Sequence, residues 1–192
     1  MKETLRGFKM DIASNEPAEV TEVFNWYEEN FQFVPNLAKV MSASPALLRS
    51  YWQTQMNLQQ MGLLRPEEHN IIQMTIAVEN QCKYCTAGHH MAGQVFFQSK
   101  EEDLQAIRKQ GKLSEERFDA LVDFTKKVYQ NQGRVADGDL EAFFAAGYDR
   151  GQALEVVTNI AAKVMSNFVN QLSLNELDEA FAPLAEGLEF AQ

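Results

Sequence analysis

Apolar positions in this chain recur at intervals of three and four residues, which is the period of one face of an α-helix. The clearest stripes comprise Leu48, Trp52 and Met56 in one segment and Leu121, Phe124 and Val128 in another. Few segments alternate apolar and polar residues as half-buried strands do. Ten glycines and five prolines in 192 residues fall below the roughly 12% that is typical of these two residues. The pattern therefore predicts an all-α protein.

Prolines and N-capping residues predict where the helices begin. Proline fits the first turn of a helix, since its missing N–H would have no partner there, and serine and aspartate side chains cap free N–H groups. The predicted starts are Pro17, Pro35, Pro45 with Ser44, Pro66, Ser99, Ser114, Asp137 and Asp149, and the predicted stops include Gly62 and Gly111. These signals predict nine or ten helices over roughly 65–75% of the chain, in one domain spanning residues 1–192.

The last long helical segment carries an apolar seam whose partner the pattern does not identify. The seam comprises Leu154, Val157, Ala161, Val164 and Phe168. Such a seam is suited to packing either inside a protomer or between protomers. Both uses stay open at this point.

Composition and charge exclude several classes of function. The net charge of −10 and the pI near 4.8 argue against a nucleic-acid partner and against docking on an anionic membrane, because both need clustered Lys and Arg. No stretch reaches the roughly 18 apolar residues of a membrane span, and residues 1–17 lack the apolar core of a signal peptide. We therefore expect a cytoplasmic protein.

The only two cysteines lie close together, at Cys82 and Cys85. They cannot form the disulfide framework of a small secreted domain, but their spacing allows a reversible bond within one helical turn. His89 follows Cys85 by four residues, on the same helical face, and could take its proton. A helix N-terminus also favours thiolate over thiol. This spacing favours a reactive Cys85, with Cys82 as the resolving thiol and no cofactor other than the redox-active Cys82–Cys85 pair.

The two cysteines have three other interpretations. They could be two inert buried thiols beside a surface histidine. A zinc site usually needs two separated ligand pairs, whereas the available donors, Cys82, Cys85, His89, His90 and His69, lie mostly on one segment, so no metal is expected. A c-type haem needs histidine directly after the second cysteine, and Thr86 stands there.

The stretch from Ala77 to His89, with the pattern C-x-x-C-x-x-x-H, resembles the alkylhydroperoxidase AhpD-like proteins of the carboxymuconolactone decarboxylase superfamily. Further segments resemble its longer peroxidase-related members: 33–36, 43–48, 143–147 and 166–170. The resemblance covers roughly residues 30–182. It implies an all-helical fold, a homo-oligomer (dimer, trimer or hexamer) and thiol-dependent reduction of organic hydroperoxides. Decarboxylase members typically lack the cysteine pair, which argues against decarboxylation.

The resemblance also implies roles and partners. Cys85 would attack the peroxide and condense with Cys82 through a sulfenic acid, with His89 relaying the proton. The substrate would be an organic hydroperoxide or another small apolar molecule, and the electron donor a thiol or lipoyl-type protein. Alternatives kept open are a protein disulfide oxidoreductase with little peroxidase activity and a non-catalytic oligomeric redox sensor.

One position departs from the family pattern. The relay usually includes a glutamate twelve residues before the first cysteine, and Asn70 stands there in this chain. An amide can orient His89 but cannot accept a proton at neutral pH. Glu68 and Glu79 are the candidates to replace that glutamate, if packing brings either of them near His89.

The chain also contains a weak internal echo at an offset of 85 residues, in which Gly147–Asn170 lies over Gly62–Cys85. The two cysteines then fall on Asn167 and Asn170. The hypothesis is a diverged duplication, with the thiol-bearing half at about 30–100 and a degenerate repeat at about 114–175. Under it, the two asparagines serve in packing or at an interface.

Overall fold

The computed structural model describes residues 17–190, so the predicted lack of a signal peptide concerns positions that lie almost wholly outside the described residues. Helices cover 71% of the described part and no strand occurs in it, which confirms the all-α prediction. The elements are α1 (Ala18–Phe31), α2 (Asn36–Met41), α3 (Pro45–Met61), α4 (Pro66–Glu79), α5 (Lys83–Val95), α6 (Glu101–Arg108), α7 (Glu116–Gln130), α8 (Asp137–Ala145), α9 (Arg150–Ser173) and the short 3₁₀ helix η1 (Ala182–Ala185).

Several helix starts follow the predicted signals. Pro45 and Pro66 occupy the first turns of α3 and α4. The side chain of Asp149 accepts a hydrogen bond from the backbone N–H of Gln152 at 2.9 Å, and the Gln152 side chain accepts one from the backbone N–H of Asp149 at 2.9 Å. This reciprocal pair is a capping box at the start of α9.

The predicted caps Ser99, Ser114 and Asp137 are wrong by one residue, and Lys100, Glu115 and Ala136 stand at the N-cap positions instead. The reason is clearest at Ser114, whose N–H and hydroxyl both donate to the carboxylate of Asp103, at 2.6 and 2.8 Å. A tertiary contact therefore takes the side chain that local sequence assigned to capping.

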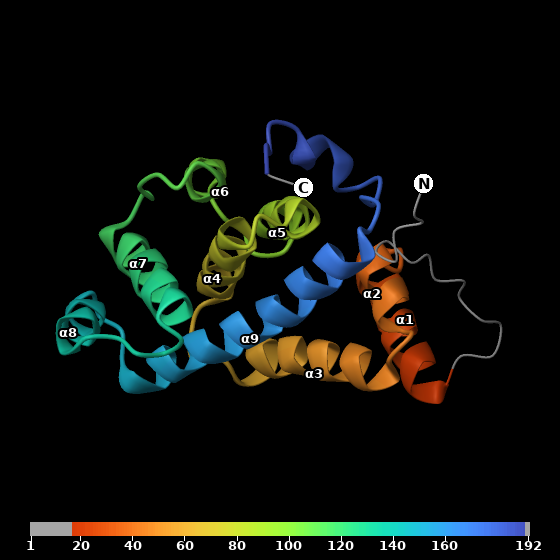
Figure 1. The fold of residues 1–192 in the computed structure, drawn as a ribbon, viewed down its shortest axis with the longest axis horizontal. Coiled ribbons are helices and arrows are strands. Elements are labelled where there is room, and N and C mark those ends of the chain that lie inside the picture. The colour runs from red at the N-terminus through yellow and green to blue at the C-terminus, as the bar shows by residue number, and fades with distance from the viewer. Residues whose placement is uncertain (1–16, 191–192) are drawn as a thin grey trace, which may run out of the picture.

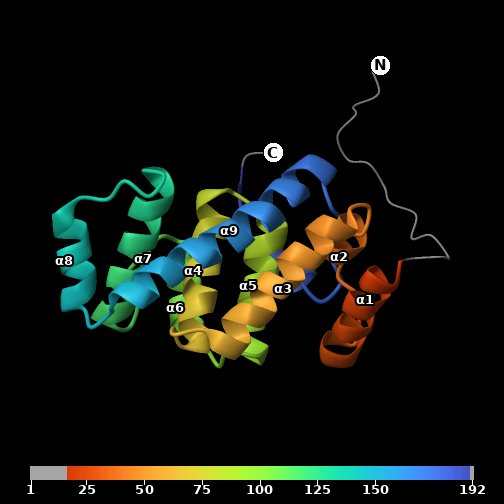
Figure 2. The same ribbon diagram turned by 90° about the horizontal axis from the view of Figure 1, so that it is seen from below.

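Helices α4 and α9 lie between two apolar cores. One core gathers residues of α1, α2, α3 and the start of α5, and the other gathers residues of α6, α7 and α8. Figure 1 shows α9 crossing the molecule, with α7 and α8 at one end and α1 and α2 at the other, and Figure 2 shows the same order from below. Residues on opposite faces of α4 therefore meet different environments.

The connection between α3 and α4 depends on a close approach at Gly62. A Cβ atom there would lie 2.3 Å from the carbonyl oxygen of Leu58 and 2.7 Å from Nε2 of His69. Its φ of −62° is open to any residue, so lack of space, and not a left-handed backbone, requires glycine. The predicted stop at Gly62 is confirmed, as the C-cap of α3.

The two halves of the predicted echo differ at the thiol turn. Cys82 is the N-cap of a new helix, after a break in which Gln81 has a φ of 52°. Asn167 and Asn170 lie inside the uninterrupted α9. The duplication itself stays a prediction.

The apolar seam of α9 faces outward. Leu154 is 72% exposed and Phe168 is 56% exposed, and Val157 between them is also exposed. Ala161 is exposed as well and Val164 is half-buried, so most of the seam is uncovered within the described part of the protomer. Within that part, no helix combines the length and the apolar character that crossing a membrane requires.

Candidate active site at the Cys82–Cys85 turn

The turn that carries the thiols is held in place by α7 and α9. The side chain of Asn80 donates to Oδ1 of Asn167 at 2.9 Å and accepts from the hydroxyl of Tyr129 at 2.5 Å. The side chain of Gln171 donates to the backbone carbonyl of Asn80 at 3.1 Å. These contacts fix the break between α4 and α5, so that α5 begins at the cysteine pair.

Cys82 and Cys85 form a disulfide, with their Cα atoms 5.3 Å apart. Cys82 caps α5, because its Sγ accepts from the backbone N–H of Cys85 at 3.3 Å. On the other side, Nδ2 of Asn170 donates to Sγ of Cys85 at 3.2 Å. Both sulfurs therefore lie next to N–H donors at a helix N-terminus, which is an environment that favours the thiolate when the pair is reduced.

His89 lies one turn after Cys85 and is bonded to Asn70, at 2.9 Å between Nδ1 of the ring and Oδ1 of the amide. A carbonyl oxygen only accepts, so this bond assigns the proton to Nδ1 and leaves Nε2 free to accept one. Burial, followed by the nearby charge of Lys163, holds the pKa of His89 well below its ordinary value. The ring is therefore neutral at pH 7.

Asn70 reaches His89 because α5 carries glycine at position 93. A Cβ atom on Gly93 would lie 2.8 Å from Nδ2 of Asn70 and 2.7 Å from a methyl carbon of Leu104. A larger residue would force the side chain of Asn70 or Leu104 to shift. The position that the resemblance assigns to a glutamate is therefore filled by an amide in direct contact with His89.

The structure places the two candidate replacement glutamates elsewhere. Glu68 faces α7 and accepts hydrogen bonds from Arg117 at 3.0 Å and from Tyr148 at 2.9 Å. Glu79 accepts from Gln130 at 2.8 Å and lies 3.7 Å from Nζ of Lys126. Neither has a hydrogen bond or ion pair with His89, so we leave both out of the proton relay.

A cavity of about 610 Å³ opens beside Cys85 and His89. Its walls are mostly apolar and include the aromatic residues Trp26, Tyr27, Phe31, Tyr51, Trp52, Tyr84, Phe96, Phe97 and Phe181. This volume lies within the range of small-molecule sites, roughly 300–1,000 Å³. Cys85 lines the cavity and Cys82 does not, so Cys85 is the sulfur that a bound molecule meets.

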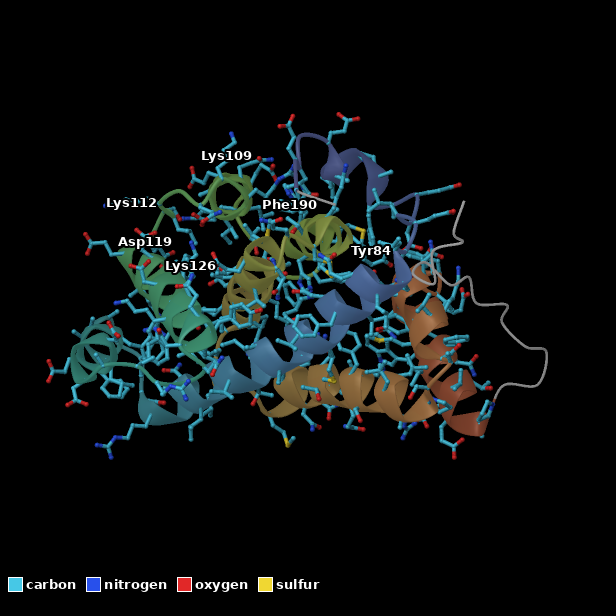
Figure 3. The ribbon with its side chains drawn as sticks, in the orientation of Figure 1. Tyr84, Lys109, Lys112, Asp119, Lys126 and Phe190 are labelled. Atoms are coloured by element: carbon cyan, nitrogen blue, oxygen red, sulfur yellow. A yellow bond between two sulfur atoms is a disulfide. The ribbon has the colours of Figure 1, made fainter. Side chains whose placement is uncertain are left out.

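The C-terminal segment after α9 completes one wall through Tyr84, the residue before Cys85. The hydroxyl of Tyr84 donates to Asp178 and accepts from the backbone N–H of Leu37 at 3.2 Å. The ring of Phe181 packs edge-to-face on Tyr84, with centroids 5.4 Å apart. Figure 3 labels Tyr84 near the end of α9, beneath the C-terminal segment.

A second histidine–asparagine pair joins α4 to α9. His69 lines the cavity, and its Nδ1 lies 3.0 Å from Nδ2 of Asn159, with Nε2 3.2 Å from Oε1 of Glu155. Burial lowers the pKa of His69, and the charge of Glu155 only partly opposes this. This histidine is held by α9 and has no contact with the sulfurs.

Lys163 of α9 also lines the cavity and is 1% exposed. Burial alone lowers its pKa to about 7. Among the described residues, no carboxylate forms an ion pair with its amine. The cavity therefore contains a lysine that is close to half-protonated at neutral pH.

The remaining donors of the motif do not converge on a metal site. His90 lies on the other face of α5, where it is bonded to Glu101 at 3.0 Å and to Arg108 at 3.1 Å. Across residues 17–190, no three His, Cys, Asp or Glu side chains are grouped as a metal would need.

Two residues of this site were missed by the sequence interpretation, Asn170 and Lys163. Asn170 was assigned to packing or to an interface, and its contact with Cys85 depends on how α9 crosses α5. Lys163 carried a usable signal, because it is a single charge inside the apolar and small-residue run from 160 to 165. A lysine that interrupts a buried run has to be paired or to face a cavity.

No protein-family model and no curated protein matches the sequence. Solved structures do match over nearly the whole chain. An uncharacterised peroxidase-related protein from Ralstonia eutropha JMP134, described as an alkylhydroperoxidase AhpD core, is 20% identical with a TM-score of 0.81, covering 93% of this chain and 96% of that one. A peroxidase-related protein from Silicibacter sp. TM1040 is 17% identical with a TM-score of 0.78, covering 98% and 99%.

The debrominase Bmp8 is also similar, at 16% identity with a TM-score of 0.75, covering 98% of this chain and 100% of that one. A cysteine-to-alanine variant of Bmp8 has been solved in complex with 2,3,4-tribromopyrrole. At these identities the likeness shows the fold alone. It confirms the AhpD-like, peroxidase-related fold that the sequence motif implied.

Proposed function

We propose that this protein is a thiol-dependent peroxidase that reduces organic hydroperoxides through the Cys82–Cys85 couple. The observation that carries the proposal is that Cys85 and His89 line one mostly apolar cavity of about 610 Å³. Cys85, which would attack, and His89, which would activate it, thus both border the space that would hold an apolar substrate. The peroxidase-related fold supports the same class of chemistry.

The reaction begins from the reduced pair. The Cys85 thiolate attacks the outer peroxide oxygen, the O–O bond breaks, and the products are a Cys85 sulfenic acid and an alkoxide that takes a proton to become the alcohol. The Cys82 thiol then attacks the sulfenic sulfur, which forms the disulfide and releases water. A dithiol donor reduces the disulfide and is itself oxidised, so that two electrons pass from donor to peroxide in each cycle.

His89 moves the proton in the first step. Its neutral ring accepts the Cys85 proton at Nε2 and later gives it to the departing alkoxide. Asn70 keeps the ring in the tautomer that leaves Nε2 free. Asn170 contributes a hydrogen bond to the Cys85 sulfur, which stabilises the thiolate. These three side chains come from α5, α4 and α9.

Access to the sulfurs favours small partners. Cys82 is 2% exposed and Cys85 is 3% exposed, so a disulfide on the surface of a folded protein cannot reach them without rearrangement. A small dithiol or a slender lipoyl-type arm fits the cavity better. This limited access supports the peroxidase proposal over general protein disulfide exchange. A peroxidase of this kind is consistent with the cytoplasmic location expected from the sequence.

Removal of bromine from an aromatic ring is a second candidate activity. The aromatic walls of the cavity suit a flat ring, and Bmp8, which shares the fold, is a debrominase. Both activities would use Cys85 as the nucleophile. A bromopyrrole offered in place of the hydroperoxide, with release of bromide measured, separates them.

We further propose that the protein works as a homo-oligomer. The exposed seam of α9, with Leu154, Val157 and Phe168, is apolar and mostly uncovered within the described part of the protomer. Exposed apolar patches of this kind are typical of subunit interfaces. The redox-sensor alternative requires that assembly change with the state of the disulfide, which sedimentation of the reduced and oxidised protein tests.

The experiment is consumption of cumene hydroperoxide driven by dihydrolipoamide. We expect Cys85→Ser to abolish turnover and His89→Ala to slow kcat/KM by about 100-fold or more, the range of a lost general base. Reduced Cys82→Ser that has been freed of dithiol should still consume one equivalent of peroxide and then stop, because its Cys85 sulfenic acid has no thiol to condense with. Normal turnover in Cys85→Ser would overturn the proposal.

A further inference from the structure

The charge inside the cavity is opposite in sign to the charge of the whole protein. The chain carries a net charge of −10, yet among residues 17–190 no aspartate or glutamate lines the cavity, and Lys163 is the one lysine or arginine that does. The other polar lining groups are amides, tyrosine hydroxyls and two neutral histidines. A molecule in this cavity therefore meets a single site able to carry positive charge.

Lys163 is held without an ionic partner. It is 1% exposed, and burial is the only cause acting on its pKa, which means that no carboxylate stabilises its charged form. Buried lysines are normally paired, because an isolated ammonium loses its hydration on folding. Lys163 therefore sits where a ligand can supply the missing negative charge.

We propose that this cavity recognises small amphipathic anions, with an aromatic or aliphatic body against the aromatic walls and one acidic group paired with Lys163. The proposal rests on the proposed function, in that it names the substrate class of the same site: hydroperoxides that carry an acidic group. It replaces the expectation of a purely apolar substrate. Lys163 acts as a specificity-determining residue, and its charge also lowers the pKa of His89.

Size and wall chemistry limit what the anion can be. A cavity of about 610 Å³ holds a body of one or two rings or a medium chain, and is too small for a macromolecule. The walls provide rings from α1, α3 and α5, including Trp26, Trp52 and Phe96, which favour flat or flexible apolar groups. A single lysine pairs with one carboxylate or phenolate.

Pairing with an anion must change the protonation of Lys163. The ionisable groups that line the cavity are Tyr27 of α1, Tyr51 of α3, His69 of α4, Tyr84, Cys85 and His89 of α5, and Lys163 of α9. The tyrosine pKa values are raised and the histidine pKa values are lowered, and Cys85 is held in the disulfide. At pH 8, Lys163, with a pKa of about 7, is therefore the lining group able to take up a proton when an anion binds.

The test uses binding to the oxidised protein, which has no turnover. The probes are 4-phenylbutyrate and its neutral isostere 4-phenylbutanamide, compared by calorimetry at pH 8 in two buffers of different ionisation enthalpy. We expect the acid to bind at least tenfold more tightly than the amide, with uptake of close to one proton. Lys163→Met, which keeps the length of the side chain and removes the amine, should abolish both the preference and the proton uptake.

Lys112→Met is the matched control. It changes the net charge by the same amount, but Lys112 is exposed and lies near α6 and α7, on the other side of α4 from α3 (Figure 3). It should keep the acid preference. Equal binding of acid and amide, no binding of either, or a preference that persists in Lys163→Met would overturn the proposal. Loss of peroxidase activity would count against the proposed function and leave this binding result unaffected.

Discussion

Glu68 on α4 and Lys163 on α9 are both buried charged side chains, but their surroundings differ. Glu68 is 0% exposed and accepts hydrogen bonds from Arg65, Arg117 and Tyr148. Lys163 is 1% exposed and has no ionic partner among the described residues. The charge of Glu68 is thus balanced by neighbouring arginines, whereas the amine of Lys163 is either partly neutral or available to pair with a bound anion.

The difference follows the two cores on either side of α4. Glu68 faces the region of α7 and α8, where the rings of Phe143 and Tyr148 stack with centroids 4.4 Å apart. Both oxygens of its carboxylate accept hydrogen bonds there. Lys163 faces the cavity between α3, α4 and α5. We infer that the first region supplies stability and the second supplies chemistry, and each prediction below tests that division.

The largest effect is expected from Glu68→Gln. Removing one partner of a buried, fully bonded ionic network typically costs about 3–5 kcal/mol, because the guanidinium of Arg117 is left without its counter-charge. We expect the free energy of unfolding to fall by about that amount in urea denaturation. Turnover per folded molecule should stay close to wild type.

The pH dependence of Glu68 provides a second readout. Burial would raise the pKa of Glu68, but the bonds from Arg65, Arg117 and Tyr148 outweigh burial and hold the pKa below its ordinary value. A carboxyl group with a lowered pKa stabilises the fold above its unfolded pKa and loses that contribution as pH falls through the folded pKa. In Glu68→Gln, the free energy of unfolding should lack the decrease at acid pH that this carboxyl group causes. The control Glu79→Gln, on the same helix, should change the free energy of unfolding by less than about 1 kcal/mol.

Lys163→Met should act in the opposite direction, with a smaller effect. An unpaired buried amine destabilises the fold while it is charged, so its replacement by an apolar side chain of similar length should stabilise the protein at pH 6 by about 2 kcal/mol. Thermal unfolding measures this, and Lys112→Met is the exposed control that should show little change. A less stable Lys163→Met protein would mean that Lys163 has a structural partner.

The same variant has a defined pH signature. The pKa of Lys163 is about 7 in the folded protein and near 10.4 in an unfolded chain, so the unfolded state binds more protons between these values. Wild-type stability should therefore rise as pH increases from about 7 towards 10. Lys163→Met should lack that rise.

The sequence predicted the helices, and it indicated the close placement of Cys82, Cys85 and His89, because both depend on local spacing. The prolines that open α3 and α4, the capping box at Asp149 and the interval from Cys85 to His89 all act within one or two turns. The caps at Ser99, Ser114 and Asp137 were misplaced by one residue. Ser114 shows why, since its side chain is used by Asp103, eleven residues away.

The rest of the site depends on how helices cross, which no local pattern encodes. Asn170 meets Cys85 across 85 positions, and Lys163 faces the cavity because α9 passes α3 and α5 at that point. Glu68 and Glu79 were candidates through their helical face alone, and packing turned Glu68 towards Arg117 instead. Local sequence likewise does not determine whether the apolar seam of α9 packs inside the protomer or faces outward, because that depends on which helices lie beside α9.

The smallest expected effect, and the most specific to the cavity region, belongs to Asn70→Asp. In the wild type, burial and the charge of Lys163 keep the pKa of His89 well below its ordinary value, so the acid limb of the activity profile should lie below pH 6.5. A carboxylate in place of the amide favours the imidazolium form, and should raise the pKa of His89 and move that limb upward by about one pH unit or more.

The matched control for Asn70→Asp is Asn159→Asp, which adds the same charge beside His69. The pH profile of kcat/KM for hydroperoxide reduction is the measurement. A shift in Asn70→Asp that is absent in Asn159→Asp identifies His89 as the base, because each variant adds one negative charge beside one of the two histidines that line the cavity. The same shift in both variants would mean that activity follows the overall charge of the cavity, and the division between Cys85 chemistry and Lys163 recognition would then have to be abandoned.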